Sequence, residues 1–377
     1  MTDHGNPNSI SLARVAVKGL VLFIAINLLF ALLTPMHALG RFSGYNSIYP
    51  GRVRLPYGDN PDLAYNLSLY NLPAMFASHE LAAGNKPTNE YRVILIGDSS
   101  VWGYLLKPEN TLSAYINTAG IQTGSGKTVR AYNLGYPTLS LTKDLLMLKY
   151  ATQHQPDMII WLVTLESFPV SKQLDSPILQ NNPAEVQELI SSNALNLNPH
   201  DPHLVTQSYW DSTLFGQRRQ LADLLRLQLY GVMWASTGVD QYYPDTYDPP
   251  QADLPNDETF QGLHPPQLFE RDLSLEVLSA GTSMAGNIPI LYVNEPIYLS
   301  QGANSDIRYN FFYPRWAYDQ YRQILESTCQ AKGWQCLDEW DLIPSGEFTN
   351  SAIHLNPAAT QLLAQVIDRA IITQANP

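Results

Sequence analysis

The chain is poor in cysteine and in positive charge. Only two cysteines occur among 377 residues, and no metal-ligand spacing accompanies them, so we expect no metal site. Lysine and arginine together number 22 against 34 acidic residues, which gives a formal net charge of -12. Such a charge repels polyphosphate, so we expect no nucleic-acid partner.

The two cysteines, Cys329 and Cys336, lie seven residues apart across the turn AKGWQ. This separation is short enough for a disulfide between the end of a helix and the next strand. Two reduced, buried cysteines are the alternative, because free cysteine packs as a small apolar side chain. The sequence leaves both open.

A long apolar run occurs at Val15 to Leu33, interrupted by Lys18, Gly19 and Asn27. Its length suits a helix that crosses a bilayer, and it lacks the polar face of a soluble surface helix. Arg14 and Lys18 precede it, so the positive-inside rule predicts a cytoplasmic N-terminus and an extracytoplasmic remainder. A cleaved signal peptide is the alternative, although TPMHALG is a poor cleavage site.

Composition divides the chain into an anchor and a globular part. Residues 1–36 form a cytoplasmic stub and the transmembrane anchor, and 37–90 form a linker that wraps onto the domain. Residues 91–377 form one domain, interrupted at about 169–264 by a long insertion with a Tyr-, Asp- and Pro-rich end. We interpret this insertion either as a lid over a site or as a surface excursion.

The globular part alternates apolar strand-like runs with helical patterns. Strands are expected at 91–96, 129–133, 158–163 and 288–293, and helices at 111–118, 141–153, 218–234, 266–285, 315–331 and 357–372. The run MIIWLV is continuously apolar, as in a strand covered on both faces. The pattern predicts an α/β fold in which a parallel sheet lies between two helical layers.

Two short segments carry residues suited to nucleophilic catalysis. Gly97, Asp98 and Ser99 follow the first strand at its carboxyl end, where open α/β sheets place reactive groups. A serine needs a base to become a nucleophile, and His354, just before a helix capped by Asn356, is a candidate. Ordinary turn and helix-cap chemistry is the alternative explanation for the first segment.

Together these segments resemble the SGNH (GDSL-like) hydrolase superfamily. The resemblance implies a flavodoxin-like three-layer α/β/α fold, with Ser99 in the GDS block as nucleophile and His354 as its base. The motif YNLGYPTLS supplies Gly135, whose amide, with that of Ser99, would hold the oxyanion, and Asp98 would support the same region. The family works without a metal or an organic cofactor.

Two of the four family blocks are altered. The third block normally reads Gly-x-Asn-Asp, but WLVTLESF offers Thr164 and Glu166 instead, so the oxyanion-hole asparagine is missing. A carboxylate at Glu166 would repel an oxyanion unless it is protonated or turned away.

The last block normally reads Asp-x-x-His, but Ser351, with Asn350 beside it, stands three residues before His354. Without the acid, a Ser-His dyad would be slower but still active. Backbone carbonyls, Ser351 or a distant carboxylate are the substitutes. Glu295 in YVNEP is the preferred carboxylate and Asp341 the next, although Glu295 also suits a turn-capping role.

The resemblance implies an esterase or an O-acyltransferase that acts on acyl esters of cell-envelope glycans or lipids. Both reactions use the same residues and differ only in whether water or a sugar hydroxyl accepts the acyl group. A degenerate family member that serves as a binding or assembly subunit beside a membrane-protein partner is the alternative, because the acid and the asparagine are missing.

Overall fold

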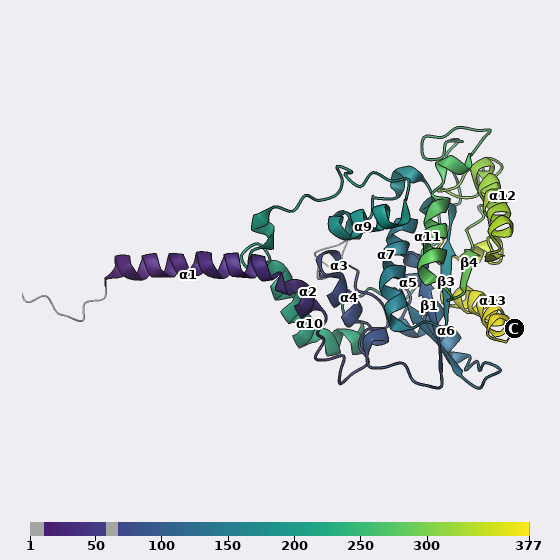
Figure 1. The fold of residues 1–377 in the computed structure, drawn as a ribbon. Coiled ribbons are helices and arrows are strands. Elements are labelled where there is room, and N and C mark those ends of the chain that lie inside the picture. Colours follow the sequence, from purple (N-terminus) through teal and green to yellow (C-terminus); the bar gives the residue numbers. More distant parts are fainter. Residues whose placement is uncertain (1–10, 58–66, 377) are drawn as a thin grey trace, which may run out of the picture.

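A five-stranded parallel sheet forms the centre of the protein (Figure 1). The computed structural model describes residues 11–57 and 67–376. The strand order is β2-β1-β3-β4-β5, and every neighbouring pair is parallel. The strands are β1 (Glu90–Ile96), β2 (Thr128–Asn133), β3 (Met158–Val163), β4 (Ile290–Asn294) and β5 (Gln335–Asp338). This flavodoxin-like order confirms the predicted fold class.

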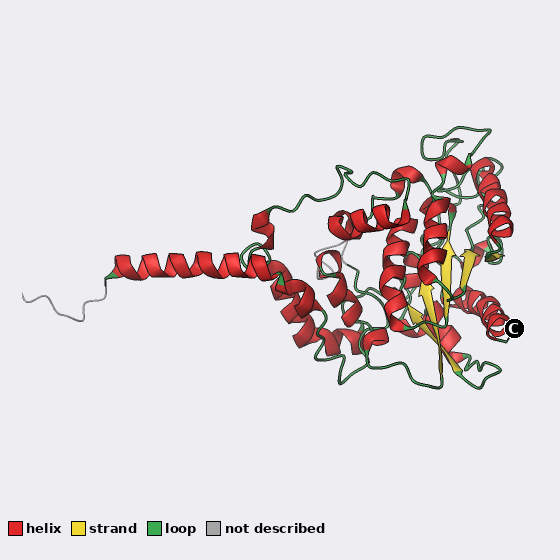
Figure 2. Ribbon diagram, in the orientation of Figure 1, coloured by secondary structure: helices red, strands yellow, loops and turns green. Residues whose placement is uncertain are grey.

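Helices cover both faces of the sheet (Figure 2). Side chains alternate along each strand, so Ile94 and Trp161 belong to one apolar layer, and Leu95 and Ile160 to the other. The first layer includes side chains of α7 (Leu141–Ala151), α11 (Leu275–Ala285) and α12 (Arg315–Lys332). The second includes side chains of α6 (Leu112–Thr118) and α13 (Pro357–Ala375). The predicted three-layer arrangement is therefore present.

Two element predictions need correction. The helix expected from Pro266 begins only at Leu275, because residues before and at prolines are driven out of helical geometry, and 266–274 contain only the short turn η7 (Glu270–Asp272). The edge strand β5 is expected from the sequence only as the strand that follows the turn between the two cysteines, without bounds. Its four residues, QCLD, are too few and too polar to stand out as a strand.

The segment 37–90 contributes to the core rather than only wrapping around it. It contains α3 (Leu67–Tyr70), α4 (Leu72–Ala77) and η1 (Glu80–Ala82), and α2 (Pro35–Gly40) leads into it. Leu72, Met75 and Phe76 are buried in the same apolar layer as α7. Removing this segment would therefore expose the core.

The insertion is largely helical. It contains η5 (Val170–Lys172), α8 (Pro177–Gln180), α9 (Pro183–Asn193), η6 (Tyr209–Ser212) and α10 (Arg218–Thr237). Its first half packs onto the central core through Leu179, Val186 and Leu189, so this half is not a surface excursion. The remaining short turns of the fold are η2 (Pro108–Asn110), η3 (Thr152–His154), η4 (Leu165–Ser167) and η8 (Ser345–Glu347).

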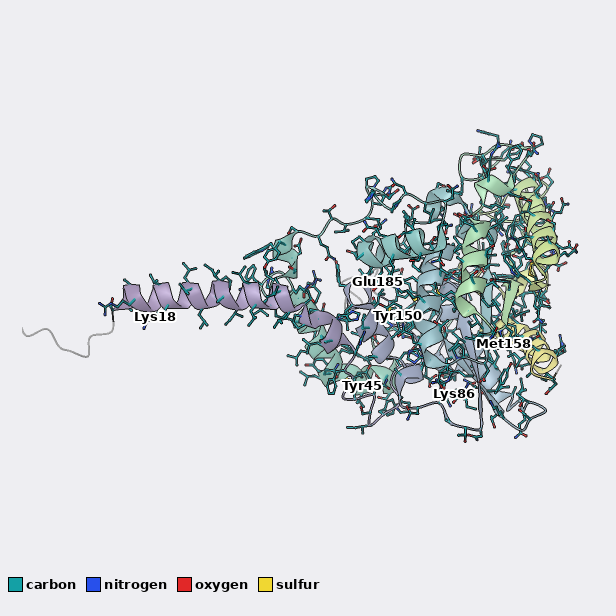
Figure 3. The ribbon with its side chains drawn as sticks, viewed as in Figure 1. Lys18, Tyr45, Lys86, Tyr150, Met158 and Glu185 are labelled. Carbon is teal, nitrogen blue, oxygen red and sulfur yellow. A yellow bond between two sulfur atoms is a disulfide. The ribbon has the colours of Figure 1, made fainter. Side chains whose placement is uncertain are left out.

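Helix α1 (Leu12–Leu33) extends away from the globular part (Figure 1). Its side chains, including Lys18, project into open space around most of its length (Figure 3). Within the part of the chain that the structure describes, this 22-residue helix is the one candidate long and apolar enough to cross a membrane. The predicted apolar run is thus a continuous helix.

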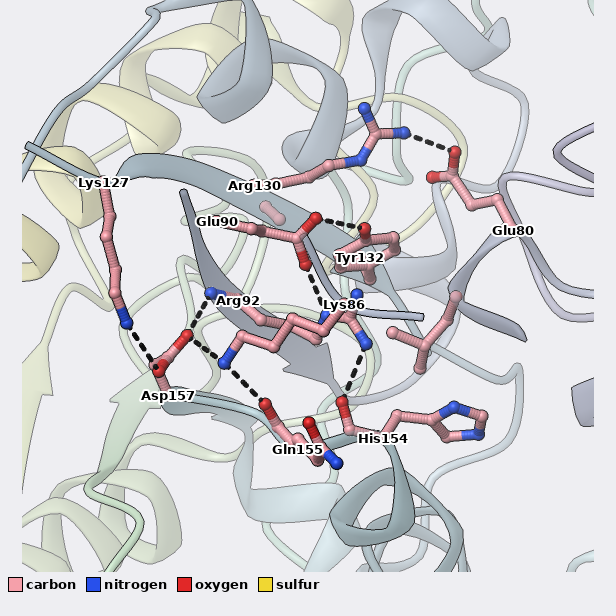
Figure 4. A network of polar contacts seen from close by, with 12 residues as sticks. Glu80, Lys86, Glu90, Arg92, Lys127, Arg130, Tyr132, His154, Gln155 and Asp157 are labelled. Carbon is pink, nitrogen blue, oxygen red and sulfur yellow. Dashed lines mark hydrogen bonds and ion pairs between the residues drawn. The ribbon is translucent and has the colours of Figure 1, made fainter. Parts of the chain in front are cut away.

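A polar network lies at the amino-terminal edge of the sheet (Figure 4). The Asp157 carboxylate accepts from the Arg92 amide at 2.6 Å and pairs with Lys86 at 2.5 Å. The Arg92 guanidinium pairs with Glu90 at 2.5 Å, and Glu90 also accepts from the Tyr132 hydroxyl at 3.0 Å. These contacts join the starts of β1 and β3, opposite the edge where the chemistry is expected, and the Tyr132 side chain reaches them from β2.

A disulfide joins Cys329 on α12 to Cys336 on β5, with Cα atoms 6.3 Å apart. It links the end of a helix to the next strand, which was one of the two alternatives left open. The bond fixes the edge strand to the helix that covers it, and it suits an oxidising compartment.

Candidate active site

The turns after four neighbouring strands meet at one edge of the sheet. Ser99 follows β1, Gly135 follows β2, Thr164 follows β3 and Glu295 follows β4. Because the strands are parallel, their carboxyl ends lie together. The fold therefore brings the predicted site segments to a single edge.

Ser99 is the first residue of α5 (Ser99–Trp102), a short helix directly after β1. Asp98 caps this helix, because its carboxylate accepts from the Ser100 amide at 2.8 Å. The helix ends at Gly103, whose φ of 84° suits glycine. The sharp strand-to-helix turn leaves Ser99 only half buried, so its hydroxyl remains accessible.

His354 lies in a tight loop before α13. A backbone bridge between Phe348 and Leu355 closes this loop, and the Thr349 amide donates to the His354 carbonyl at 2.8 Å. The loop places His354 Nε2 2.8 Å from Ser99 Oγ. Two segments separated by 255 positions thus meet in the contact that a nucleophile and its base require.

The second imidazole nitrogen contacts Asn350. His354 Nδ1 lies 3.1 Å from Asn350 Oδ1, and an amide oxygen can only accept, so Nδ1 carries the hydrogen. Ser351, one of the substitutes for the acid that the sequence left open, accepts from the Ile353 amide at 3.4 Å, and its catalytic role stays a prediction. A neutral amide stands where the family has a carboxylate.

The surroundings keep His354 uncharged. Burial lowers the pKa of His354 to about 4, and no carboxylate opposes that effect. The Tyr104 ring packs over the imidazole with a centroid distance of 5.0 Å. Near neutral pH the imidazole is therefore a free base with its Nε2 lone pair toward Ser99.

Glu295 does not orient the histidine. Its buried carboxyl group accepts from the Ser100 hydroxyl and hydrogen bonds with Asp98. Burial, and then the charge of Asp98, raise the pKa of Glu295 well above its ordinary value. This shift favours the protonated form of Glu295, whose side chain ties the turn after β4 to the turn that carries Ser99. The other carboxylate candidate, Asp341, has an exposed side chain.

A buried lysine supports the same turns. Lys143 on α7 donates to the carbonyls of Gly97 and Tyr136, both at 2.8 Å, and pairs with Asp144 at 2.5 Å. Burial raises the pKa of Asp144 to about 6, and Lys143 opposes that rise. Sequence reasoning missed both residues, because Lys-Asp within LTKDLLMLKY reads as an ordinary surface pair.

Gly135 fits its predicted place, but its amide is engaged. A Cβ atom on Gly135 would lie 2.3 Å from the Trp102 backbone nitrogen, so only glycine allows the turns after β1 and β2 to pack this closely. The Gly135 amide donates to Asn133 Oδ1 at 3.0 Å. An oxyanion would have to replace that bond, so the oxyanion role of Gly135 stays a prediction.

The altered third block is held by a tyrosine and a lysine. Thr164 Oγ1 lies 2.8 Å from the Tyr313 hydroxyl, and Glu166, two residues later, stands where the family has its asparagine. The Glu166 carboxylate pairs with Lys172 and accepts from Gln261 at 2.6 Å. Burial raises the pKa of Glu166, and the bond from Lys172 opposes the rise. Both contacts go to Glu166 Oε1 and come from the insertion, whereas the buried Oε2 has no hydrogen-bond partner among the described residues. The predicted part of Glu166 in substrate binding stays a prediction.

The end of the insertion follows the same edge of the sheet. Arg54, which donates to the Gly103 carbonyl at 3.0 Å, lies over the Tyr243 ring at 5.9 Å. Further along, the Ala252 carbonyl accepts from Ser300 in the loop after β4. The lid interpretation of the insertion at about 169–264 therefore stays a prediction. In 11–57 and 67–376, no group of three or more His, Cys, Asp or Glu side chains is arranged to hold a metal ion.

Solved structures of ester hydrolases are similar to this chain. A lipase/acylhydrolase from Enterococcus faecalis has 13% identity and a TM-score of 0.38, covering 75% of this chain and 96% of its own. An acetylxylan esterase from Geobacillus stearothermophilus, solved as a catalytic mutant, has 11% identity and a TM-score of 0.37, covering 74% and 94%. A carbohydrate acetylesterase family member from Sinorhizobium meliloti has 12% identity and a TM-score of 0.32, covering 75% and 98%.

By name, the three neighbours are a lipase/acylhydrolase and two acetylesterases. No family model and no curated protein matches the sequence. At TM-scores below 0.5 the similarities carry no argument about activity, which therefore rests on the chain's own residues.

Proposed function

We propose that this protein is a membrane-anchored, extracytoplasmic serine esterase or O-acyltransferase of the SGNH type. One observation carries the proposal: Ser99 Oγ lies 2.8 Å from Nε2 of an imidazole whose Nδ1 hydrogen is held by Asn350. This is the tautomer that accepts a proton from serine. The Asn350 side chain thus supports the proposal as the group that orients His354 in place of the missing acid.

In the proposed reaction, Ser99 Oγ attacks the ester carbonyl while His354 Nε2 takes the hydroxyl proton. The tetrahedral intermediate then collapses, the bond to the leaving alcohol breaks, and His354 returns its proton to that alcohol. Water or a sugar hydroxyl next attacks the acyl-serine, with His354 again as base. The products are a free acid or a new ester, together with unmodified Ser99.

The proposed substrates are acylated glycans or lipids of the cell envelope. Helix α1 supports a location at the membrane, and Arg14 and Lys18 at its start favour a cytoplasmic N-terminus. The disulfide Cys329–Cys336 favours an oxidising, extracytoplasmic compartment for the domain. An enzyme held there would meet acyl esters of surface polymers.

The test is hydrolysis of short-chain aryl esters and acetylated polysaccharides by the full chain in detergent. We expect Ser99→Ala to lower kcat/KM by at least about a hundredfold, since Ser99 is the hydroxyl that contacts the imidazole base. Ser327→Ala, an exposed serine on α12, is the matched control and should retain activity. Acyl transfer to an added glycan at the expense of hydrolysis would assign the transferase.

A binding or assembly subunit is the second candidate. The engaged Gly135 amide and the uncharged Asn350 favour it, because both weaken stabilisation of charge during catalysis. Equal, background rates for the wild type and Ser99→Ala, with retained binding of acetylated polysaccharide, would favour this candidate over the enzyme.

A further inference from the structure

The insertion touches the side of α1. The Phe215 amide donates to Asn27 Oδ1 at 2.9 Å, and the rings of Phe215 and Phe23 lie 6.4 Å apart. Asn27 is 3% exposed, and its amide nitrogen donates to the Phe23 carbonyl at 2.9 Å. The polar side chain within the apolar helix is thus used to dock the insertion.

This contact lies on the N-terminal side of Leu33, the last residue of α1. Asn27 precedes Leu33 by six residues, which corresponds to about 9 Å along the axis. The polar headgroup layer of one leaflet is roughly 5–8 Å thick. Helix α1 has 22 residues and is therefore about 33 Å long, close to the roughly 30 Å thickness of the hydrocarbon core. If α1 spans a bilayer, Phe215 lies at or just below the boundary between headgroups and acyl chains in the leaflet nearest Leu33.

The segment 209–215 has side chains suited to that boundary. Tyr209 and Trp210 are 63% and 52% exposed, and the Trp210 ring lies 5.9 Å from that of Phe215. The Arg218 guanidinium lies 4.3 Å from the centroid of the Phe215 ring. Tyrosine, tryptophan and arginine with apolar bodies and polar ends are typical of membrane interfaces.

Helix α10, which follows this segment, has two apolar faces. Leu224, Leu227 and Gly231 are buried, and Gly231 lies directly against the Tyr45 ring. On the opposite face, Leu225 and Leu229 are 59% and 67% exposed, and Val232 and Met233 continue the stripe at helical spacing. One face is covered by the domain, and the other is uncovered in the described chain.

The uncovered face belongs to the side of the domain that carries the anchor. The Gly44 amide donates to Gln228 Oε1 at 2.8 Å, which ties the middle of α10 to the turn after α2, just beyond α1. Figure 1 shows α10 beside the end of α1, on the side from which α1 extends. The helix carries three arginines and one aspartate, a net charge of +2 in a chain of net charge -12.

We propose that residues 209–215 and the outward face of α10 form a second membrane contact, which rests in the extracytoplasmic leaflet beside α1. Lipid is the occupant, because the surface continues from the apolar helix, has interfacial aromatic residues and carries three arginines against two aspartates, Asp211 and Asp223. This inference rests on the proposed membrane anchor, but not on catalysis. It makes the anchored domain lie against the bilayer at a fixed orientation.

The test uses the full chain in lipid nanodiscs with one spin-labelled cysteine at a time. The native disulfide leaves each introduced thiol as the single labelling site. Leu229→Cys and Trp210→Cys report on the proposed contact. Ile24→Cys on α1 reports on the anchor, and Leu362→Cys on α13 is the exposed control. Accessibility to oxygen and to a water-soluble nickel chelate is measured at each position.

We expect labels at positions 229 and 210 to favour oxygen over the chelate, as at 24, whereas 362 favours the chelate. If the labels at positions 229 and 210 favour the chelate while the label at position 24 favours oxygen, the second membrane contact is wrong and the anchor stands. Chelate access at 24 as well would overturn the anchor itself. Shielding of 229 from both reagents would show a protein partner on this face and would overturn lipid as its occupant.

Discussion

His354 Nδ1 lies 3.1 Å from Asn350 Oδ1, so an amide occupies the place of the acid in a Ser-His-Asp triad. The amide fixes the tautomer, as a carboxylate does. It supplies no negative charge for the imidazolium that forms during attack. A triad acid normally both orients the histidine and stabilises its positive charge, and in this protein Asn350 provides only the orientation.

Restoring the charge should increase activity. Asn350→Asp would place a carboxylate beside Nδ1, raise the pKa of His354 and stabilise its charged form. We expect kcat/KM for an aryl ester to rise about ten- to a hundredfold. Asn350→Leu, which removes the acceptor, should lower it. A rate unchanged by both variants would contradict the orienting role of Asn350.

The pH profile should extend unusually far into acid. Burial lowers the pKa of His354 to about 4, so the free base persists from neutral pH down toward that value. The value of kcat/KM should fall as pH drops through about 4, rather than through the ordinary value of 6.5. The buried, uncharged His354 also destabilises the folded state as the pH falls below 6.5, because the unfolded chain then binds a proton that the folded chain does not. Circular dichroism at each pH separates this unfolding from the titration of His354 in the folded protein. An inflection near 6.5 would show that His354 is not the buried base.

Glu295 is expected to act as a neutral acid. Glu295→Gln keeps its shape and lacks its charge, so activity at neutral pH should stay within about threefold of wild type. Glu295→Ala leaves Ser100 and Asp98 without their partner and should cost about 1–3 kcal/mol in unfolding free energy. At high pH, ionisation beside Asp98 should lower wild-type activity, and the glutamine variant should resist that loss. Denaturant titration and pH-rate profiles measure both effects.

Lys143 should stabilise the fold far more than a surface lysine does. Lys143→Met leaves Asp144 buried without a counter-charge, which costs about 3–5 kcal/mol. Lys149→Met on the same helix, which breaks partly exposed pairs with Glu185 and Glu188, should cost less than about 1 kcal/mol. Adding Asp144→Asn to Lys143→Met should recover part of the loss. Equal destabilisation by the two lysine variants would contradict the buried-pair assignment.

Strand and helix positions near the site followed from local sequence patterns. The apolar runs that became β1 and β3, and the capped helix α13, have strong periodicity or cap signals, and they place Ser99 and His354 at element ends. The sequence predicts a helix over 266–285, but proline geometry delays its start to Leu275.

Contacts between distant side chains could not be predicted in the same way. The sequence names Ser351 at the family spacing, yet the loop between Phe348 and Leu355 turns so that Asn350 faces the imidazole. Glu295 is five residues beyond the start of β4, but its protonation depends on Asp98 from another strand. Such assignments depend on three-dimensional packing, which spacing alone does not encode.

The most direct test of the account is labelling of the full chain by a fluorophosphonate probe, which reacts with a serine activated by a base. We predict stoichiometric labelling of the wild type at Ser99, slower labelling of His354→Ala and none of Ser99→Ala. Ser327→Ala, the exposed-serine control, should be labelled at the wild-type rate. Absence of labelling in the wild type, under conditions that label a known serine esterase, would contradict the account.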